Sequence, residues 1–97
     1  MMEEAEYMAF VEALMTASSS LSGLGAGIVA ALALDIAADS RTFARLLGVA
    51  HALVLREVSG LGQDGGYLRV RQRDPRTQRI RYELSTAGHR LVEEATG

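Results

Sequence analysis

The period of the hydrophobic pattern changes late in the chain, and this change constrains the fold more than any other feature. Two apolar residues alternate with arginines in residues 68–73, and apolar residues alternate with charged ones again in residues 79–84. Alternation with a period of two is typical of half-buried strands. The segment 74–78 between them is hydrophilic and contains Pro75, whose fixed backbone angle favours a turn. Residues 68–84 therefore predict a two-stranded hairpin with one apolar face and one arginine-rich face.

The remainder of the chain shows the patterns of helices. Apolar residues recur at helical spacing near the N-terminus, and Ser22 can cap the helix that follows. Asp39 or Ser40 supplies another N-cap, and Gly48 closes a short helix as a C-cap. Two short helices joined at Gly48 form a helix-turn-helix pattern. The predicted helices cover residues 3–16, 24–38, 50–61 and 85–95, with a short helix that follows the cap at residue 39 or 40 and ends at residue 47.

Composition narrows the class of protein. A chain of 97 residues with 48% hydrophobic residues is long enough for one packed domain, predicted to span residues 1–97. The absence of cysteine excludes disulfides and thiolate metal sites. The N-terminus is acidic where a secretory signal would be basic, and the apolar run at residues 24–34 is too short to span a bilayer. We therefore expect a cytoplasmic protein with no membrane partner.

Charge is distributed unevenly along the chain. Residues 1–39 contain six acidic residues and no basic one, whereas residues 40–97 contain ten arginines and six acidic residues. The two parts therefore carry formal charges of −6 and +4, within a net charge of −2. This asymmetry favours a basic half that faces an anionic partner. The alternative is that this charge asymmetry, and the use of arginine in place of lysine throughout the chain, arose by chance.

The order of the predicted elements resembles that of the MarR-like winged helix-turn-helix regulators, as a small, truncated member. The resemblance runs from about residue 21 to residue 92. It is carried by Leu21-Ser22, by the segment Phe-Ala-Arg-Leu-Leu-Gly-Val at 43–49, by Val54, Arg56, Val58 and Leu61, by Asp74-Pro75, and by Leu-Ser-Thr-Ala-Gly-His-Arg-Leu at 84–91. It implies a mainly α fold with a β-hairpin wing, a three-helix core within residues 22–97 and an N-terminal helix within residues 1–17.

The same resemblance implies binding of double-stranded DNA by a transcriptional regulator. In such folds one helix enters the major groove, and the wing contacts the phosphate backbone or the minor groove. Arginine suits both tasks because its planar guanidinium makes paired hydrogen bonds to phosphate or guanine. The predicted DNA-binding residues are His51, Arg56, Arg69, Arg71, Arg73, Arg76 and Arg79.

Three departures from the family pattern affect the predicted recognition helix. Ala50 and Leu55 occupy positions where the family usually has serine or threonine, and Glu57 replaces an apolar residue. Few groups are then left to form hydrogen bonds with base edges, which favours backbone binding over sequence-specific binding. The alternative function is a winged-helix module that binds an acidic protein partner through its arginine-rich face.

A homodimer is also predicted, because the family dimerises through its terminal helices. The long C-terminal helices of that interface have no counterpart in this sequence, so the N-terminal helix would have to serve. Its predicted interface residues are the apolar stripe Tyr7, Phe10, Val11 and Leu14. A small-molecule effector is compatible with the family, but no residue pattern indicates one.

Catalytic and cofactor sites are not indicated by any local motif. His51 and His89 have no cysteine near them, and a metal site needs three or four converging ligands. The glycines at 23, 25 and 27 follow no strand and precede no Gly-Lys-Ser/Thr, so a loose helix start explains them better than a phosphate loop. We expect no cofactor, no metal and no enzymatic activity.

Overall fold

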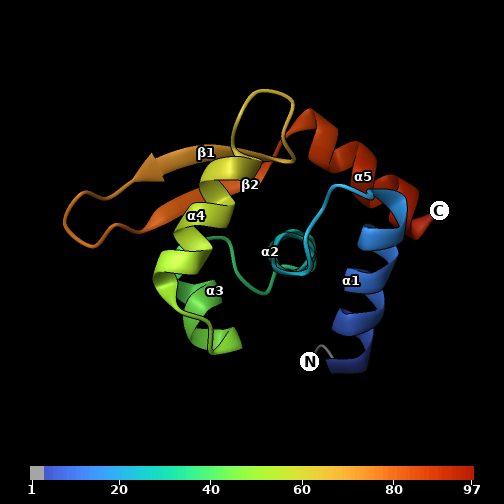
Figure 1. Cartoon of the computed structure of the whole chain (residues 1–97), viewed down its shortest axis with the longest axis horizontal. Coiled ribbons are helices and arrows are strands. Elements are labelled where there is room, and N and C mark those ends of the chain that lie inside the picture. The colour runs from blue at the N-terminus through green and yellow to red at the C-terminus, as the bar shows by residue number, and fades with distance from the viewer. Residues whose placement is uncertain (1–3) are drawn as a thin grey trace.

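The computed structural model describes residues 4–97, and within them five helices and one hairpin follow the predicted order (Figure 1). The predicted start of the first helix at residue 3 lies outside the described residues. The elements are α1 (Glu4–Ala17), α2 (Gly23–Ala33), α3 (Ser40–Leu47), α4 (His51–Leu61), β1 (Leu68–Arg73), β2 (Ile80–Leu84) and α5 (Thr86–Thr96). This is a winged helix fold, as the sequence predicts: α2, α3 and α4 form a three-helix core beside the hairpin.

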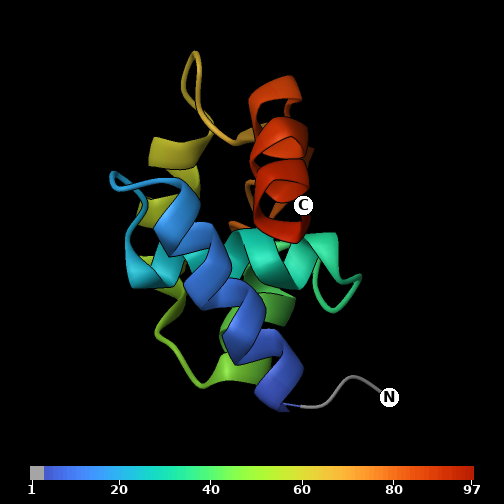
Figure 2. The same ribbon diagram turned by 90° about the vertical axis from the view of Figure 1, so that its right-hand side faces the viewer.

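Helix α2 lies at the centre of the molecule (Figure 1). It begins after Ser22, whose hydroxyl accepts the Gly25 N–H at 2.9 Å. Every residue from 25 to 31 is buried, because α1 packs on one side of the helix, and α4 and β2 pack on others. Figure 2 shows α1 lying across α2 and beside α5. The apolar surface that the sequence shows on nearly every side of α2 is thus covered within a single chain.

The predicted extent of this helix, residues 24–38, is wrong at its C-terminal end. The helix ends at Ala33, and Asp35 adopts a left-handed backbone with φ 62°. The chain must leave the helix here because the residues that follow pair with the hairpin. Ala38 accepts the Tyr82 N–H at 3.1 Å, and Asp39 forms a bridge to Arg81. Tertiary pairing has overridden local helix propensity in these residues.

Helices α3 and α4 form the predicted helix-turn-helix. Asp39 caps α3 by accepting the N–H groups of residues 41 and 42, each at 3.0 Å. Gly48 ends α3 with φ 66°, a left-handed conformation that glycine adopts without steric cost. Phe43, Val54 and Val58 fix the pair against the core, each 0–1% exposed.

The hairpin contains a bulge that changes which face its arginines occupy. Val70 pairs with Tyr82, but the next pair is Gln72 with Arg81, so Arg71 is the extra residue. A bulge shifts the alternation by one position. Arg73 therefore pairs with the buried Ile80 and shares its face. The prediction that Arg73 lies on the same outer face as the preceding arginines is wrong for this reason.

The core joins residues from all the elements. Its most completely buried side chains are Leu14, Ile28, Val29, Ser40, Phe43, Val54, Val58 and Tyr82. Within residues 4–97, no helix combines the length and the apolar character that crossing a membrane requires.

Candidate nucleic-acid interface

Helix α4 turns Val54 and Val58 into the core and leaves a face of mixed character in contact with solvent. We call this the exposed face of α4, formed by Ala52, Leu53, Arg56 and Ser59. Its first turn has no side-chain cap, because the N-cap residue is an alanine. Arg56 and Ser59 are its only side chains with hydrogen-bonding groups.

Glu57 lies at the side of α4 and bonds to the start of α2. Its Oε1 atom accepts a hydrogen bond from the Ser22 hydroxyl at 2.8 Å. The sequence comparison with the MarR-like pattern suggests weaker packing at Glu57. In the structure Glu57 makes a polar contact between α4 and the start of α2.

His51 is held by a buried serine between three elements. Ser40, which is fully buried, accepts the Ile80 N–H at 2.9 Å and lies 2.9 Å from Nε2 of His51. Partial burial, followed by the charge of Arg41, lowers the pKa of His51, which favours the neutral imidazole. In the neutral tautomer that carries its proton on Nδ1, Nε2 accepts a hydrogen bond from the Ser40 hydroxyl. The histidine, predicted to contact DNA, thus ties the first turn of α4 to α3 and β2.

Arg79 is engaged by a buried carboxylate. Its Nε atom lies 3.4 Å from Oδ2 of Asp39, the N-cap of α3, which is 6% exposed. Burial by itself would raise the pKa of Asp39. Hydrogen bonds from Thr42 and Arg41, together with the charge of Arg79, outweigh burial and hold this pKa below its usual value. Arg79 therefore anchors the wing to the helix-turn-helix.

Arg41 clamps the turn of the wing, a role that the sequence did not reveal. Its guanidinium donates two hydrogen bonds to the carbonyl of Thr77, from Nε at 3.1 Å and from a terminal nitrogen at 2.9 Å. The turn itself is fixed by Asp74, which accepts the Arg76 N–H at 2.9 Å, and by Gln78 with φ 61°. No local signal in the sequence could place Arg41, on α3, beside a turn 36 residues away.

The remaining arginines of the wing fall into two groups. Arg69 and Arg71 both form ion pairs with Glu83 on the outer face of the hairpin. Arg73, Arg76 and Arg81 have no carboxylate within ion-pair distance among residues 4–97. Arg76 lies in the turn, and Arg81 lies on the outer face opposite Gln72. The cations that the protein has not neutralised are therefore at the turn and on both faces of the hairpin near it.

A groove of about 470 Å³ separates α4 from the wing. Leu55 and Ser59 line it from α4, and Arg73 and Ile80 line it from the hairpin. The bulge is what brings Arg73 to this groove, since regular alternation would have turned it away. Residues of the turn complete the lining: Asp74, Pro75 and Gln78.

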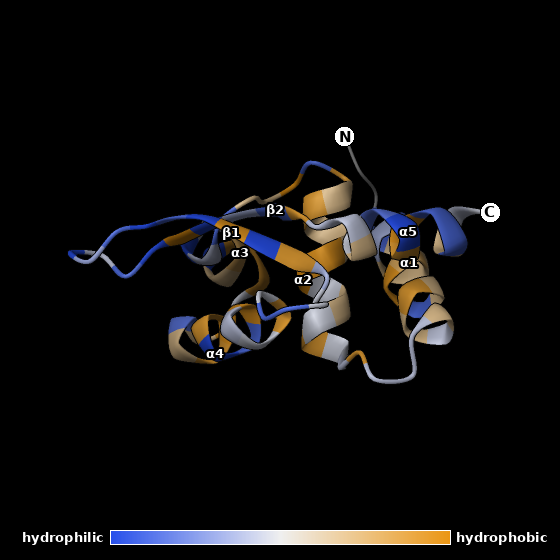
Figure 3. Cartoon of the chain, turned by 90° about the horizontal axis from the view of Figure 1, so that it is seen from above, coloured by the Kyte–Doolittle hydropathy of each residue, from blue (hydrophilic) through white to orange (hydrophobic). Residues whose placement is uncertain are grey.

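The acidic first helix and the arginine-rich wing lie on opposite sides of the molecule (Figure 1). The acidic residues of α1 lie on one side of α2, and the wing projects from the other side (Figure 1). Figure 3 shows the hydrophilic hairpin extending away from the body of the fold. An anion approaching α4 and the wing would thus meet arginines while remaining distant from α1.

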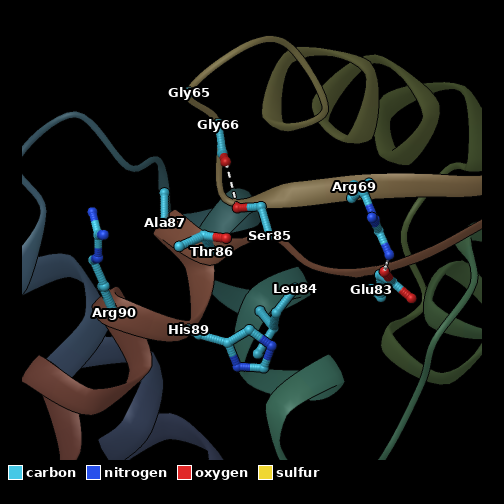
Figure 4. A pocket seen from close by; sticks show the side chains of 10 residues that line it. All are labelled: Gly65, Gly66, Arg69, Glu83, Leu84, Ser85, Thr86, Ala87, His89 and Arg90. Atoms are coloured by element: carbon cyan, nitrogen blue, oxygen red, sulfur yellow. Dashed lines mark hydrogen bonds and ion pairs between the residues drawn. The ribbon is translucent and has the colours of Figure 1, made fainter.

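A second cleft, of about 600 Å³, lies where the base of the hairpin meets α5 (Figure 4). Four of its lining residues are bonded to one another: Arg69 pairs with Glu83, and the Ser85 hydroxyl donates to the Gly66 carbonyl at 2.6 Å. His89 and Arg90 lie on its α5 side. These contacts connect the base of the wing to the start of α5.

Three of the four residues predicted at a dimer interface are part of the core of the single chain. Tyr7, Val11 and Leu14 are 8%, 6% and 0% exposed, and the Tyr7 hydroxyl donates to the Gly27 carbonyl at 2.9 Å. Phe10 is half-buried. Their apolar surface is covered by α2 and α5 and does not require a second copy.

Metal-binding chemistry has no cluster to support it in the described part of the chain. No group of three or more histidine, cysteine, aspartate or glutamate side chains converges within residues 4–97.

The comparisons support the fold described above. The chain is similar to a solved structure described as the transcriptional regulator Tm0710 from Thermotoga maritima, with a TM-score of 0.69 over 96% of this chain. The two sequences are 23% identical, and this chain spans 66% of the length of that protein. No protein-family model and no curated protein matches the sequence. The likeness shows the fold of the chain, a winged helix.

Proposed function

We propose that the protein is a transcriptional regulator of the MarR-like type that binds double-stranded DNA through α4 and the wing. The observation that carries the proposal is that Arg56, Arg73 and Arg76 have no carboxylate partner among residues 4–97 and lie on the two elements that border one groove. Arg56 lies on the exposed face of α4, Arg73 lines the groove from the hairpin, and Arg76 lies in the turn. A fold shared with a transcriptional regulator supports the same conclusion.

In this proposal α4 enters the major groove of the DNA. One phosphate backbone of the DNA then passes over the protein groove that lies between α4 and the wing. Ser59 and Arg73 then face phosphates, and Arg76 reaches a phosphate or the minor groove beyond. Arg41 and the Asp39–Arg79 pair do not contact DNA in this arrangement. They hold the wing at a fixed angle to α4, so that both elements can bind at the same time.

Fluorescence-anisotropy titration with random-sequence duplexes at about 50 mM and about 200 mM salt tests the proposal. Raising the salt concentration from the lower to the higher value should weaken binding roughly 3.5-fold for each phosphate contacted, because the slope is about 0.9 per phosphate. Arg76→Ala should lower the affinity for every sequence and reduce that slope. Absence of binding to any duplex at the lower salt concentration would refute the proposal.

Dimerisation belongs to the same proposal but needs a surface other than the predicted stripe. Met8 and Met15 on α1 are 47% and 41% exposed and are the large apolar side chains still accessible on that helix. A two-fold dimer would present two α4 helices to half-sites about one turn of DNA apart. Sedimentation of the wild type beside a Met8→Glu, Met15→Glu variant tests this surface. A monomeric wild type at micromolar concentration would contradict it.

A protein partner is the second candidate. Leu46 at the end of α3 and Leu53 on α4 are 54% and 47% exposed, and exposed leucines beside arginines suit an acidic protein with apolar anchors. This candidate predicts no duplex binding at low salt. We propose no enzymatic step, cofactor or effector for the chain.

A further inference from the structure

The exposed face of α4 is unusually apolar for a helix proposed to read DNA. Ala52 and Leu53 lie in its first turn, and Leu53 is 47% exposed. Ala50, immediately before the helix, is also exposed. Val54 and Val58 already fill the core beneath α4, so these residues are not needed for packing within the chain.

Charge around this apolar surface limits what can cover it. Arg56 lies one turn beyond Leu53, at the i,i+3 spacing of helix neighbours, and Arg73 lies across the adjoining groove. A complementary ligand therefore has anionic edges and an apolar centre. The major groove of DNA has this form where thymine occurs, because the thymine methyl group projects between two rows of phosphates.

We propose that Ala52 and Leu53 contact thymine methyl groups in the major groove, and that Arg56 supplies the polar contact beside them, to a guanine edge. This inference rests on the proposed function and adds a chemical preference to it. Bound sites are enriched in thymine opposite the first turn of α4. Ala52 and Leu53 then discriminate between bases by methyl contact rather than by hydrogen bonding.

Deoxyuridine differs from thymidine only by lacking this methyl group, so it provides a direct test. The full chain is first used to select duplexes from a random library, and the best duplex is then made with thymine or with uracil throughout. Anisotropy should show that uracil weakens binding roughly fourfold for each contacted methyl, the amount expected from burial of one methyl-sized apolar group. Leu53→Ala and Leu53→Ser should each reduce the ratio between the two affinities, and Leu53→Ser combined with Ala52→Ser should bring the two affinities close to equality.

Two controls separate the possible failures. Met8→Ala, which changes an exposed apolar residue on α1, should keep the wild-type ratio between the two duplexes. Arg76→Ala should weaken binding to both duplexes by the same factor. Far-ultraviolet circular dichroism of each variant verifies that α4 remains folded.

The outcomes distinguish this inference from the proposed function. Equal wild-type affinity for thymine and uracil duplexes would overturn the methyl contact while leaving DNA binding intact. A uracil effect as large in both Leu53 variants as in the wild type would overturn the assignment to Leu53. Failure of the library to yield any bound duplex at low salt would overturn both, and would favour the protein partner.

Discussion

Replacing Arg73 tests the bulge, the groove and the proposed DNA contact together. The bulge at residue 71 places Arg73 on the face of Ile80, beside α4, with no carboxylate partner among the described residues. Arg69 lies on the outer face of the same strand and pairs with Glu83. Arg73→Ala and Arg69→Ala thus remove the same charge from opposite faces of one strand.

The expected loss follows from the release of counterions. One phosphate contact contributes a slope of about 0.9 in the logarithm of affinity against the logarithm of salt concentration. The contribution of this one phosphate contact to the affinity is taken as zero near about 1 M salt. Arg73→Ala should then weaken DNA binding roughly 15-fold at about 50 mM salt and roughly 4-fold at about 200 mM salt. Arg69→Ala should change the affinity for DNA little, because Glu83 already neutralises Arg69. It should also change the stability of the fold little, because exposed ion pairs contribute little to stability.

Anisotropy titrations of the two variants and the wild type at several salt concentrations provide both affinity and slope. Arg73→Lys serves as a further control, since it retains the charge and should retain most of the slope. Equal losses for Arg69→Ala and Arg73→Ala would contradict the assignment of DNA to the α4 side of the wing. An unchanged slope in Arg73→Ala would contradict the phosphate contact.

Three further predictions concern stability and pH. Gly88→Ala should destabilise the fold by several kcal/mol, on the order of the cost of overpacking, because a Cβ atom there would overlap the Tyr67 carbonyl. Thermal unfolding measures this loss, and a melting temperature equal to that of the wild type would refute the prediction. Tyr82→Phe should leave the free energy of unfolding in urea unchanged or raise it by about 1 kcal/mol, because the buried Tyr82 hydroxyl has no hydrogen-bond partner within residues 4–97. A large loss of stability would show that this hydroxyl is hydrogen-bonded. The lowered pKa of His51 means that below its ordinary value of 6.5 the unfolded chain binds a proton that the folded chain does not. The free energy of unfolding should therefore decrease as pH falls from 6.5 towards the folded pKa, and His51→Gln should flatten this dependence in urea titrations at several pH values.

Local patterns in the sequence were sufficient to predict the order of the elements. Caps at Ser22, Asp39 and Ser85, the left-handed glycine at position 48 and the alternation of residues 68–84 are signals that neighbouring residues determine. Ser22 and Gly48 cap their helices as predicted, Asp39 is the cap among the two predicted candidates Asp39 and Ser40, and the hairpin forms where the alternation predicted it. Such signals do not depend on how distant parts of the chain meet.

The features that were missed depend on distant contacts. Helix α2 ends at Ala33 because residues 38 and 39 pair with β2, which helix propensity cannot reveal. The bulge at Arg71 has no glycine to mark it, so simple alternation placed Arg73 on the wrong face.

Residue type suggested which side chains could bind an anion, but not which of them were already engaged. His51 is bonded to Ser40, Arg79 is paired with Asp39, and Arg69 and Arg71 share Glu83. These partners come from other elements of the fold. The sequence therefore predicts the composition of the interface, whereas the tertiary structure determines which arginines remain available.

Two-dimensional amide NMR of the labelled protein, titrated with duplex DNA, tests the central claim most directly. The account predicts that chemical shifts change along the exposed face of α4 and in residues 72–78 of the wing, with little change in α1 or α5. Changes concentrated in α1 and α5 would contradict the proposed interface. A spectrum unaffected by saturating duplex at low salt would contradict DNA binding itself.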